Sequence, residues 1–420
     1  MFKKPKGTKD IYGSRQENRE LVIKTLEAIA SFYNFKKIDT PIFESVDLFK
    51  RSVGETSDIV SKEMYEFKDK KNREFVLKPE GTAGVIRAFV ENKIFAESQP
   101  SKLFYLTPAF RYERPQKGRQ RQFTQFGIEL IGIKSPTADA EVIMLAYQIL
   151  NSLEVPNFKL HINSLGDKET RDNYSNALKK YLSEYKEQLT EQSVKRLDIN
   201  PLRILDDKID GNKEFVKNSP KIQEFYTKET KDYFEKVKKL LEAANIEYEI
   251  SPKLVRGLDY YSEIIFEFNS YSEVTGSQSA IIGGGRYDKL VKQFGGPELS
   301  GVGFGLGVER LVNEVENVRE ANKPYIDAYI VNMNDETTLA TTSLAYMLRN
   351  AGFTIEHNLK VMKLNKAFDK ASKEGAKFVI IFGKKEIQEG KIVVKNQITS
   401  EQESVDIMKI VEYLDERIEE

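Results

Sequence analysis

The sequence contains no cysteine and only two histidines among its 420 residues. Without cysteine, this chain has no disulfide bonds, no thiolate catalysis and no Cys-type zinc site. The two histidines, His161 and His357, lie far apart, which excludes a His-rich metal centre and disfavours a Ser-His-Asp triad. His161 lies in a strand-like run, so we interpret it as structural. Chemistry must therefore depend on Arg, Lys, Asp, Glu, Tyr and backbone groups, which suit phosphate chemistry based on positioning and charge neutralisation.

Net charge and long hydrophobic runs are also missing. Lys plus Arg equals Asp plus Glu at 65 each, so any nucleic-acid binding must come from local basic patches. No apolar run approaches the roughly 20 residues that span a bilayer, and the N-terminus lacks the apolar core of a signal peptide. Neither a Walker A motif nor the G-x-G-x-x-G dinucleotide pattern occurs. We therefore expect a soluble, cytoplasmic protein with two or three domains.

The most informative stretch runs from residue 110 to residue 127. Turn residues at 115–118 and period-two alternation on both sides predict a long β-hairpin with one apolar and one polar face per strand. Five basic side chains surround the single acid Glu113: Arg111, Arg114, Lys117, Arg119 and Arg121. Guanidinium groups match phosphate oxygens, and Phe123 could stack on a base. A solvated, charged hairpin is the alternative, but the concentrated arginines favour a site for a flat anion.

Three further stretches carry polar groups beside glycine. Residues 79–84, Pro-Glu-Gly-Thr-Ala-Gly, open a helix whose amides could cradle an anion, although such loops are also ordinary connections. Residues 256–261 crowd an arginine, an aspartate and two tyrosines together, and we favour a site there over a polar turn. Glycine at every second position of residues 301–307 predicts a strand with one face of bare backbone, on which something flat can lie. The helix that follows delivers Arg310 to the strand end.

The rest of the chain predicts helices and a separate C-terminal domain. A capping box at Ser14 and Glu17 predicts the start of a long helix. Ser135 at the cap and Pro136 at the first helical position predict the start of another. Charged amphipathic helices from about 168 to 245 indicate a helical insertion. From residue 326, strands and helices alternate and predict an α/β domain with a mostly parallel sheet and a final helix over about 403–417. This domain is expected to bind RNA, and dimerisation or regulation is the alternative.

Several motifs together resemble a known family. Phe-Arg-x-Glu at 110–113, Arg-Gln-Phe at 121–123 and the glycine-rich run that ends at Arg310 resemble motifs two and three of class II aminoacyl-tRNA synthetases. The matches that narrow the resemblance to histidyl-tRNA synthetases are Lys-Gly-Thr-x-Asp, Pro-Glu-Gly-Thr-Ala, Arg-Pro-Gln-Lys-Gly-Arg, Asn-Ser-Leu-Gly, Arg-Gly-Leu-Asp-Tyr-Tyr and Gly-Gly-Arg-Tyr-Asp. The resemblance covers nearly the whole chain, and the block at 256–261 is its most specific part.

The resemblance implies an α+β fold, in which an antiparallel class II sheet is flanked by helices. The implied divisions are a catalytic first part at 1–167 with motifs one and two, a helical insertion at 168–250, a catalytic second part with motif three at 251–322, and an α/β anticodon-binding domain at 325–420. Residues 41–51 resemble motif one, which implies a homodimer.

The implied activity is a histidine–tRNA ligase that forms histidyl-adenylate from ATP and L-histidine and transfers the histidine to tRNA(His). The resemblance implies catalytic roles for Arg256 and Arg111. The implied ATP-binding residues are Arg111, Glu113, Arg119, Arg121, Phe123 and Arg310. The implied histidine-binding residues are Glu80, Gly81, Thr82, Gln125, Glu129, Arg256, Tyr260 and Tyr261. A loop tip at Arg114, Gln116 and Lys117 would approach the tRNA acceptor end. Mg²⁺ would arrive on the ATP phosphates, with no metal held by the protein.

Two other readings of the resemblance stay open. A synthetase-like regulator would sense histidine or uncharged tRNA, but such paralogues typically lose motif arginines or the C-terminal domain, both of which are present here. Another class II synthetase with the same type of C-terminal domain is disfavoured by the 256–261 block. Two positions depart from the family pattern: Lys78 stands where arginine is usual, and Thr124 stands where histidine or asparagine is common.

Overall fold

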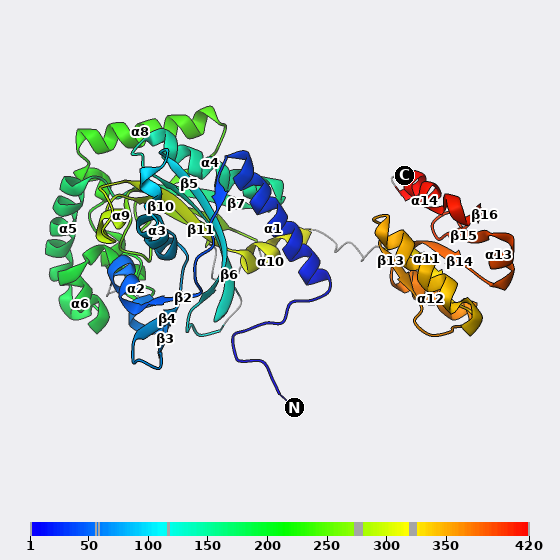
Figure 1. Ribbon diagram of the computed structural model, residues 1–420. Helices are drawn as coiled ribbons and strands as arrows, with labels where there is room; N and C mark the ends of the chain where they lie inside the picture. The colour runs from blue at the N-terminus through cyan, green and yellow to red at the C-terminus, as the bar shows by residue number, and fades with distance from the viewer. Residues whose placement is uncertain are drawn as a thin grey trace. The chain divides into compact units, whose positions relative to one another are not determined.

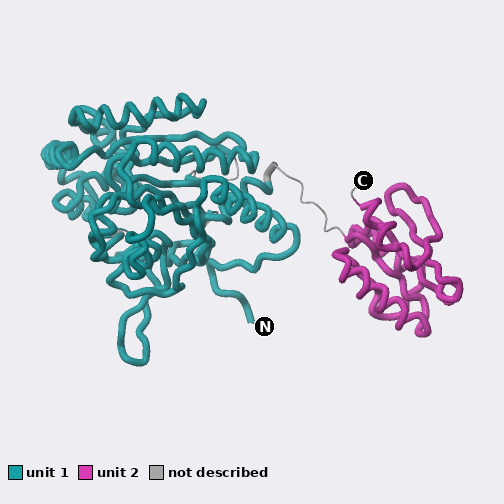
Figure 2. Tube along the Cα trace, turned by 45° about the horizontal axis from the view of Figure 1, so that its top comes forward, with its two compact units in different colours: residues 1–320 teal, residues 321–420 magenta. Residues whose placement is uncertain are grey.

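The chain forms two compact units, residues 1–320 and 321–420 (Figure 2). The computed structural model describes residues 2–54, 57, 59–115, 118–272, 280–318 and 326–418. Each unit has hydrophobic clusters of its own among these residues. Within the part of the chain that the structure describes, no helix combines the length and apolarity needed to cross a membrane.

An eight-stranded sheet forms the centre of the first unit (Figure 1). In sheet order its strands are β1 (Lys36–Lys37), β5 (Ser101–Phe110), β6 (Gln122–Ile131), β11 (Gly301–Gly307), β10 (Ala280–Tyr287), β9 (Ser262–Ser270), β7 (Phe158–Ser164) and β8 (Glu249–Ile250). Neighbouring strands are antiparallel except for the parallel pairs at the two edges, β1 with β5 and β7 with β8. The antiparallel sheet that the family resemblance implies is thereby confirmed.

Helices cover both faces of this sheet because its strands alternate apolar side chains between the two faces. One face packs on α1 (Ser14–Phe32), α4 (Pro136–Ser152), α8 (Lys228–Ala243) and α10 (Val308–Val318). The other packs on α3 (Thr82–Glu91), α5 (Lys168–Ser183), α6 (Glu191–Ile199) and α9 (Leu290–Gln293). On β5, for example, Phe104 belongs to the first core and Tyr105 to the second.

A small second sheet lies in the same unit. It has the order β2 (Phe43–Ser45), β4 (Glu74–Leu77) and β3 (Tyr65–Lys68), and α2 (Val46–Val53) follows its first strand. The insertion between β7 and β8 consists of α5, α6, α7 (Glu214–Lys217) and α8, with 3-10 turns that include Pro201–Ile204. The charged amphipathic helices expected in this region are confirmed.

The hairpin of β5 and β6 is confirmed, but its strands are shorter than predicted. The backbone N–H of Arg111 still donates to the carbonyl of Arg121, at 3.0 Å. Beyond that pair the ladder opens, because Tyr112 donates to Glu63 and Arg121 donates to Gly7, both at 2.7 Å. The arginines of this stretch therefore lie in the connection between the strands and not on the strands themselves.

The two predicted helix starts differ in outcome. The predicted capping box at Ser14 is wrong, because Ser14 is the first helical residue and Gly13 occupies the N-cap with φ of 59°. Glycine reaches that positive φ without steric cost, so α1 starts without a side-chain cap. The second start is confirmed: Ser135 caps α4 by accepting a hydrogen bond from the Thr137 N–H, and Pro136 stands at the first position.

The second unit is a five-stranded sheet with helices. Its strand order is β13 (Ile355–His357), β12 (Ile326–Val331), β14 (Ala376–Ile381), β15 (Lys391–Asn396) and β16 (Gln402–Asp406). The helices are α11 (Thr338–Asn350), α12 (Leu364–Lys373), α13 (Lys384–Glu389) and α14 (Ile410–Ile418).

Two predictions for this unit are corrected. The sheet is mixed, because β15 and β16 are antiparallel to their neighbours. The predicted helix over 403–417 is wrong in its first part, where β16 forms a hairpin with β15. The turn is set by the Asn396 side chain, which accepts from the N–H groups of Ile398 and Thr399. Such asparagine turns leave little signal in a hydrophobic pattern.

Candidate active site

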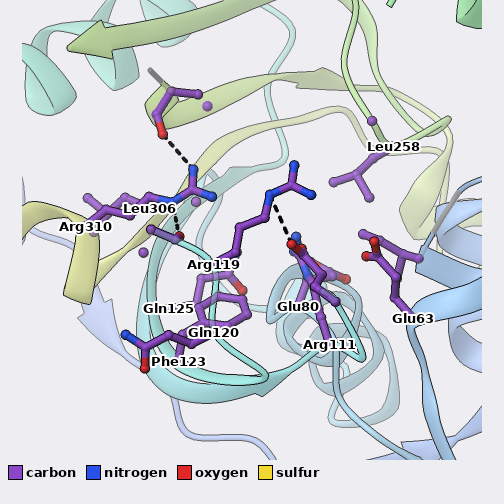
Figure 3. A pocket seen from close by; sticks show the side chains of 18 of the residues that line it. Glu63, Glu80, Arg111, Arg119, Gln120, Phe123, Gln125, Leu258, Leu306 and Arg310 are labelled. Atoms are coloured by element: carbon purple, nitrogen blue, oxygen red, sulfur yellow. Dashed lines mark hydrogen bonds and ion pairs between the residues drawn. The ribbon is translucent and has the colours of Figure 1, made fainter. Parts of the chain in front are cut away.

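A cleft of about 1470 Å³ opens in the first unit (Figure 3). It brings together residues from β6, β10, β11, α3, α10, the 256–261 stretch and the insertion. The sequence-predicted residues that line it are Glu80, Thr82, Arg111, Glu113, Arg119, Phe123, Gln125, Arg256, Tyr260, Tyr261 and Arg310. Side chains separated by more than 200 residues in sequence thus meet at one concave, mixed polar and apolar site.

Arg111 and Phe123 form one wall of the cleft. The Arg111 guanidinium carbon lies 5.3 Å from the centre of the Phe123 ring, a cation–π arrangement. Arg111 is also held by its Nε, which donates to the carbonyl oxygen of Pro79 at 2.9 Å. Next to them, Glu113 and Arg119 form an ion pair, with Nε and Oε2 3.1 Å apart. This wall offers a flat ring and two guanidinium groups.

Arg310 projects into the cleft from the first turn of α10. Its Nε donates to the carbonyl of Gly118 at 3.0 Å and its Nη1 donates to the carbonyl of Ala280 at 2.8 Å (Figure 3). Burial, and then the nearby Arg111 guanidinium, lower the pKa of Arg310. Cations gathered in this way, with part of their hydration removed, favour binding of an anionic group.

Arg256 lies in the irregular stretch before β9 and is paired with Glu267 on that strand. Its guanidinium lies directly over Gly283 of β10, where an added Cβ would be only 1.9 Å from Nη2. Gly283 is therefore the reason that Arg256 can lie flat against the sheet. Burial acts to lower the pKa of Arg256, but the Glu267 carboxylate and the other groups nearby outweigh it, so the pKa is raised.

A carboxylate and an amide organise the start of α3. Both oxygens of Glu80 accept backbone N–H groups, from Thr82 at 2.7 Å and from Ala83 at 2.8 Å. The Gln125 side chain accepts from the N–H of Gly81 at 2.8 Å. Burial nevertheless raises the pKa of Glu80. The loop that the sequence left ambiguous is thus fixed at the edge of the cleft by the hairpin and by Glu80.

Glu129 lies next to the cleft but does not line it. It is buried on β6 and accepts a hydrogen bond from the Tyr287 hydroxyl at 2.5 Å. Burial raises the pKa of Glu129 to about 8, although the Tyr287 hydrogen bond acts in the opposite direction. Tyr105 and Tyr287 were not predicted as site residues. Each fills the space beside a glycine of the neighbouring strand. A tyrosine that pairs with a glycine across two strands is the sequence feature that could have identified them.

The glycine strand β11 corrects one expectation. Its face is not open to a ligand along its length, because side chains of the chain itself occupy it. An added Cβ would collide with Tyr287 at Gly301, with Glu129 at Gly303 and with Gln125 at Gly305. The glycines instead let polar side chains of β6 and β10 approach the backbone closely.

Some predicted residues lie elsewhere. The Arg121 guanidinium carbon is 3.9 Å from the centre of the Tyr112 ring, and its Nε donates to the carbonyl of Glu113 at 3.2 Å, so this side chain supports the connection and does not line the cleft. Arg114 is exposed. Gln116 and Lys117 lie outside the described residues.

The two departures from the family pattern now have structural explanations. Lys78 is fully buried outside the cleft and donates to the carbonyl and the hydroxyl of Thr40, both at 3.1 Å, while burial lowers its pKa to about 8. The Thr124 N–H donates to both oxygens of Glu309, and its hydroxyl accepts from Arg19. Thr124 thus connects β6 to α10 and α1.

Comparison with known proteins agrees with the fold and the cleft. Residues 7–311 match the family model for histidyl-tRNA synthetase, and residues 327–417 match the model for an anticodon binding domain. The histidine–tRNA ligase of Latilactobacillus sakei is 46% identical over 94% of this chain and 92% of its own. That of Bacillus licheniformis is 44% identical over 98% of both chains. The crystal structure of apo S. aureus histidyl-tRNA synthetase has a TM-score of 0.84 and 36% identity, and the match covers 99% of this chain and 100% of the other.

The antiparallel sheet, the cleft beside its glycine strand and the C-terminal anticodon-binding α/β domain define a class II aminoacyl-tRNA synthetase. Within that class, the chain belongs to the histidyl-tRNA synthetase family.

Proposed function

We propose that this chain is a histidine–tRNA ligase and that the cleft is where L-histidine and ATP react. The observation that carries the proposal is that one cleft joins the Arg111–Phe123 wall to the polar residues around the start of α3. A nucleotide needs cations and a stacking surface, and an amino acid needs a carboxylate and hydrogen-bond acceptors. Both sets of groups line the same space.

In the first step, the histidine carboxylate attacks the α-phosphorus of ATP, and pyrophosphate leaves. The chain supplies no nucleophile for this step, so its contribution is alignment and charge neutralisation. We assign the α-phosphate to Arg111 and Arg256, whose guanidinium groups would neutralise the charge that develops on the phosphate oxygens. Mg²⁺ would enter bound to the ATP phosphates.

For the adenine ring we propose a position between Phe123 and Arg310, with Glu113 accepting a hydrogen bond from the amino group. The Arg111 guanidinium carbon lies 5.3 Å from the centre of the Phe123 ring. This contact supports the use of the ring face for binding cations and flat rings. Arg119 would lie along the phosphates, and its ion pair with Glu113 would set the position of both groups before ATP binds. Arg121 is assigned a supporting role, because its contacts are with Tyr112 and the hairpin backbone.

Histidine would be selected by its imidazole ring. A neutral imidazole carries one donor and one acceptor, so a carboxyl group and a phenol can pair with both nitrogens. We assign these roles to Tyr261, which lines the cleft, and to Glu129, which lies buried next to it and would have to be reached by the imidazole, with Tyr260 in the same pocket. The α-amino group is assigned to Glu80, Thr82 and Gln125. Analogues that lack one nitrogen would leave a buried polar group unpaired, which is strongly disfavoured.

The second step transfers histidine to the 3′ end of tRNA(His). We propose that the loop from Arg114 to Lys117 approaches the acceptor end and that the second unit reads the anticodon. Its match to an anticodon-binding domain supports the second assignment. Because tRNA is charged where proteins are synthesised, we propose a cytoplasmic location.

The chain is also proposed to act as a homodimer through the region of β2. Phe43 and Phe67 are 52% and 41% exposed, and their rings stand 6.1 Å apart on the small sheet, beside exposed Ile42. Exposed aromatic clusters of this kind typically mark protein interfaces. Phe43→Asp should shift the protein from dimer to monomer, as measured by light scattering after size exclusion. An unchanged mass would contradict this interface.

The test of the proposed function is ATP–pyrophosphate exchange with each of the standard amino acids in turn. Exchange should depend on histidine alone. Exchange with threonine or proline would redirect the assignment to another class II enzyme, and exchange with none in folded protein would refute the enzyme reading.

A regulator that senses histidine or uncharged tRNA is the competing function. A structure described as an ATP phosphoribosyltransferase regulatory subunit/histidyl-tRNA synthetase from Bacillus halodurans C has a TM-score of 0.65 but only 22% identity, and this likeness extends to the fold alone. The presence of Arg111, Arg256 and Arg310 in the cleft favours the enzyme over the regulator.

A further inference from the structure

The insertion contributes a wall to the cleft, a role that its charged amphipathic helices did not predict. Its 3-10 turn at Pro201–Ile204 carries Arg203, which is 7% exposed and lines the cleft together with the neighbouring Asp206. A charged side chain this deeply buried normally has a specific structural task.

The partners of Arg203 define that task. Its Nη1 donates to the carbonyl oxygen of Arg256 at 2.9 Å, and its Nη2 donates to the carbonyl oxygen of Gly257 at 3.0 Å. One guanidinium thus binds two consecutive carbonyls, a use of the planar fork that lysine cannot reproduce. Its Nε also lies 3.6 Å from Oδ1 of Asp259 in the same stretch.

The stretch that Arg203 binds has no regular secondary structure. Residues 251–261 lie between β8 and β9 in turns and bends, so their carbonyl groups have no partners in a sheet ladder or helix. The insertion supplies a second contact there, since the Asn200 amide donates to Oδ1 of Asp259 at 3.2 Å. The insertion therefore binds the backbone at the point from which the Arg256 side chain extends, while Glu267 and Gly283 determine where its guanidinium lies.

We propose that Arg203 is a positioning residue for the amino-acid activation step. By binding the main chain at residues 256 and 257, it sets the point from which the Arg256 guanidinium reaches the α-phosphate. The insertion is thereby part of the activation machinery and not only a peripheral domain. This inference rests on the proposed function, since it assigns Arg203 an effect exerted through Arg256.

The test is a double-mutant cycle in the full-length protein, measured by histidine-dependent ATP–pyrophosphate exchange. Arg203→Ala should lower kcat by about 100-fold, since a displacement of about 1 Å in a catalytic group can cost that much. The KM for histidine should change far less. In an Arg256→Ala background, adding Arg203→Ala should lower kcat by no more than about twofold, because the residue through which it acts is already absent.

A conservative variant and a matched control complete the design. Arg203→Lys keeps the charge but loses the fork, so kcat should fall by about tenfold while the melting temperature stays close to wild type; this variant serves if Arg203→Ala does not fold. Lys179→Ala removes an exposed ion pair of the same insertion, in which Nζ and Oδ1 of Asp198 are 2.8 Å apart, and it should leave kcat unchanged.

The outcomes separate the two claims. If wild-type protein shows no histidine-dependent exchange, the proposed function fails. If the wild type is active and the Arg203 variants retain full kcat, the positioning role alone is refuted. If the fall in kcat of the double variant equals the product of the falls in the two single variants, the positioning role is also refuted. Arg203 would then act independently of Arg256.

Discussion

Gly283 leaves free the space in which the Arg256 guanidinium lies. An added Cβ at Gly283 would lie 1.9 Å from Nη2 and 2.3 Å from Cζ of Arg256. We predict that Gly283→Ala displaces the guanidinium and lowers kcat for histidine-dependent exchange by about 10- to 100-fold. The melting temperature should change little, since a long side chain can move aside.

The control for this prediction is the Arg256→Ala background. Without the guanidinium there is nothing for the new methyl group to displace, so Gly283→Ala should then have almost no further effect on kcat. An equal loss in both backgrounds would mean that the glycine matters to the sheet backbone and not to Arg256.

The raised pKa of Glu129 predicts that the stability of the fold depends on pH. Burial raises its pKa to about 8 in the folded chain, whereas an exposed glutamate titrates near 4.5. Between these pH values the folded state binds more protons than the unfolded state, so the contribution of Glu129 to stability falls as pH rises from about 4.5 to 8. Glu129→Gln keeps an acceptor for Tyr287 and removes the titration.

We therefore expect the free energy of unfolding of Glu129→Gln, relative to wild type, to rise by about 1.4 kcal/mol per pH unit in that window. Urea denaturation at pH 5, 6, 7 and 8 measures it. Parallel curves for the two proteins would show that Glu129 stays ionised in the folded state.

Many residues of the cleft were predictable, because they belong to short motifs that can be recognised in the sequence alone. Arg111, Phe123 and Arg310 were expected at the site and line it. Tyr105 and Tyr287 were missed, since their contact with the site depends on which glycines face them across the sheet. Tyr105 pairs with Gly127 and Tyr287 pairs with Gly301, in each case on consecutive strands. Even there, the register depends on tertiary structure and is not contained in the local pattern.

At the scale of elements, a buried ion pair ties the insertion and two layers of the first unit together. Arg286 on β10 pairs with Asp139 on α4, with Nη2 and Oδ1 2.8 Å apart and both side chains 0% exposed. Tyr233 on α8 donates to the same carboxylate at 2.6 Å. Burial raises the pKa of Asp139 to about 6 against the opposing effect of Arg286. The Gly-Gly-Arg-Tyr-Asp motif therefore has a structural arginine beside its glycines.

Removing one member of this pair should be costly. Arg286→Leu leaves the Asp139 carboxylate buried without its cation, and we expect a loss of about 3–5 kcal/mol in the free energy of unfolding, measured by urea denaturation. Lys292→Ala removes an exposed pair with Glu298, whose side chains are 63% and 77% exposed, and should cost less than about 1 kcal/mol. Similar losses in the two variants would contradict the structural role of the buried pair.

Helices and strands were predictable where the hydrophobic periodicity extends over many residues and where capping or turn residues mark the ends. The Ser135–Pro136 start of α4 is an example, because cap and proline act locally. The failures are at short elements. In β16, Val405 is the only residue of the strand that is buried, so its pattern is too weak to distinguish strand from helix. In α1, Gly13 and not Ser14 is the N-cap, because the chain turns at the glycine, before it reaches the serine.

At the scale of the whole molecule, the two units have separate cores. Among the described residues, the two hydrophobic clusters of residues 321–420 contain members of that unit only, with Ala328, Phe378 and Leu414 in one and Tyr329 and Val379 in the other. A segment of this size with its own core is large enough to fold alone. We predict that residues 321–420, expressed separately, unfold in a single calorimetric transition with an enthalpy of about 60–80 kcal/mol.

The complementary fragment, residues 1–320, holds every described residue that lines the cleft. It should therefore retain histidine-dependent ATP–pyrophosphate exchange. Its kcat/KM for tRNA(His) aminoacylation should fall by about 100-fold, equivalent to about 2.7 kcal/mol of lost tRNA recognition. Light scattering on the fragment checks that a loss of the dimer does not account for the change. If exchange falls as far as aminoacylation does while the fragment stays folded and dimeric, the second unit acts on the activation step itself, and its assignment to anticodon recognition alone is wrong.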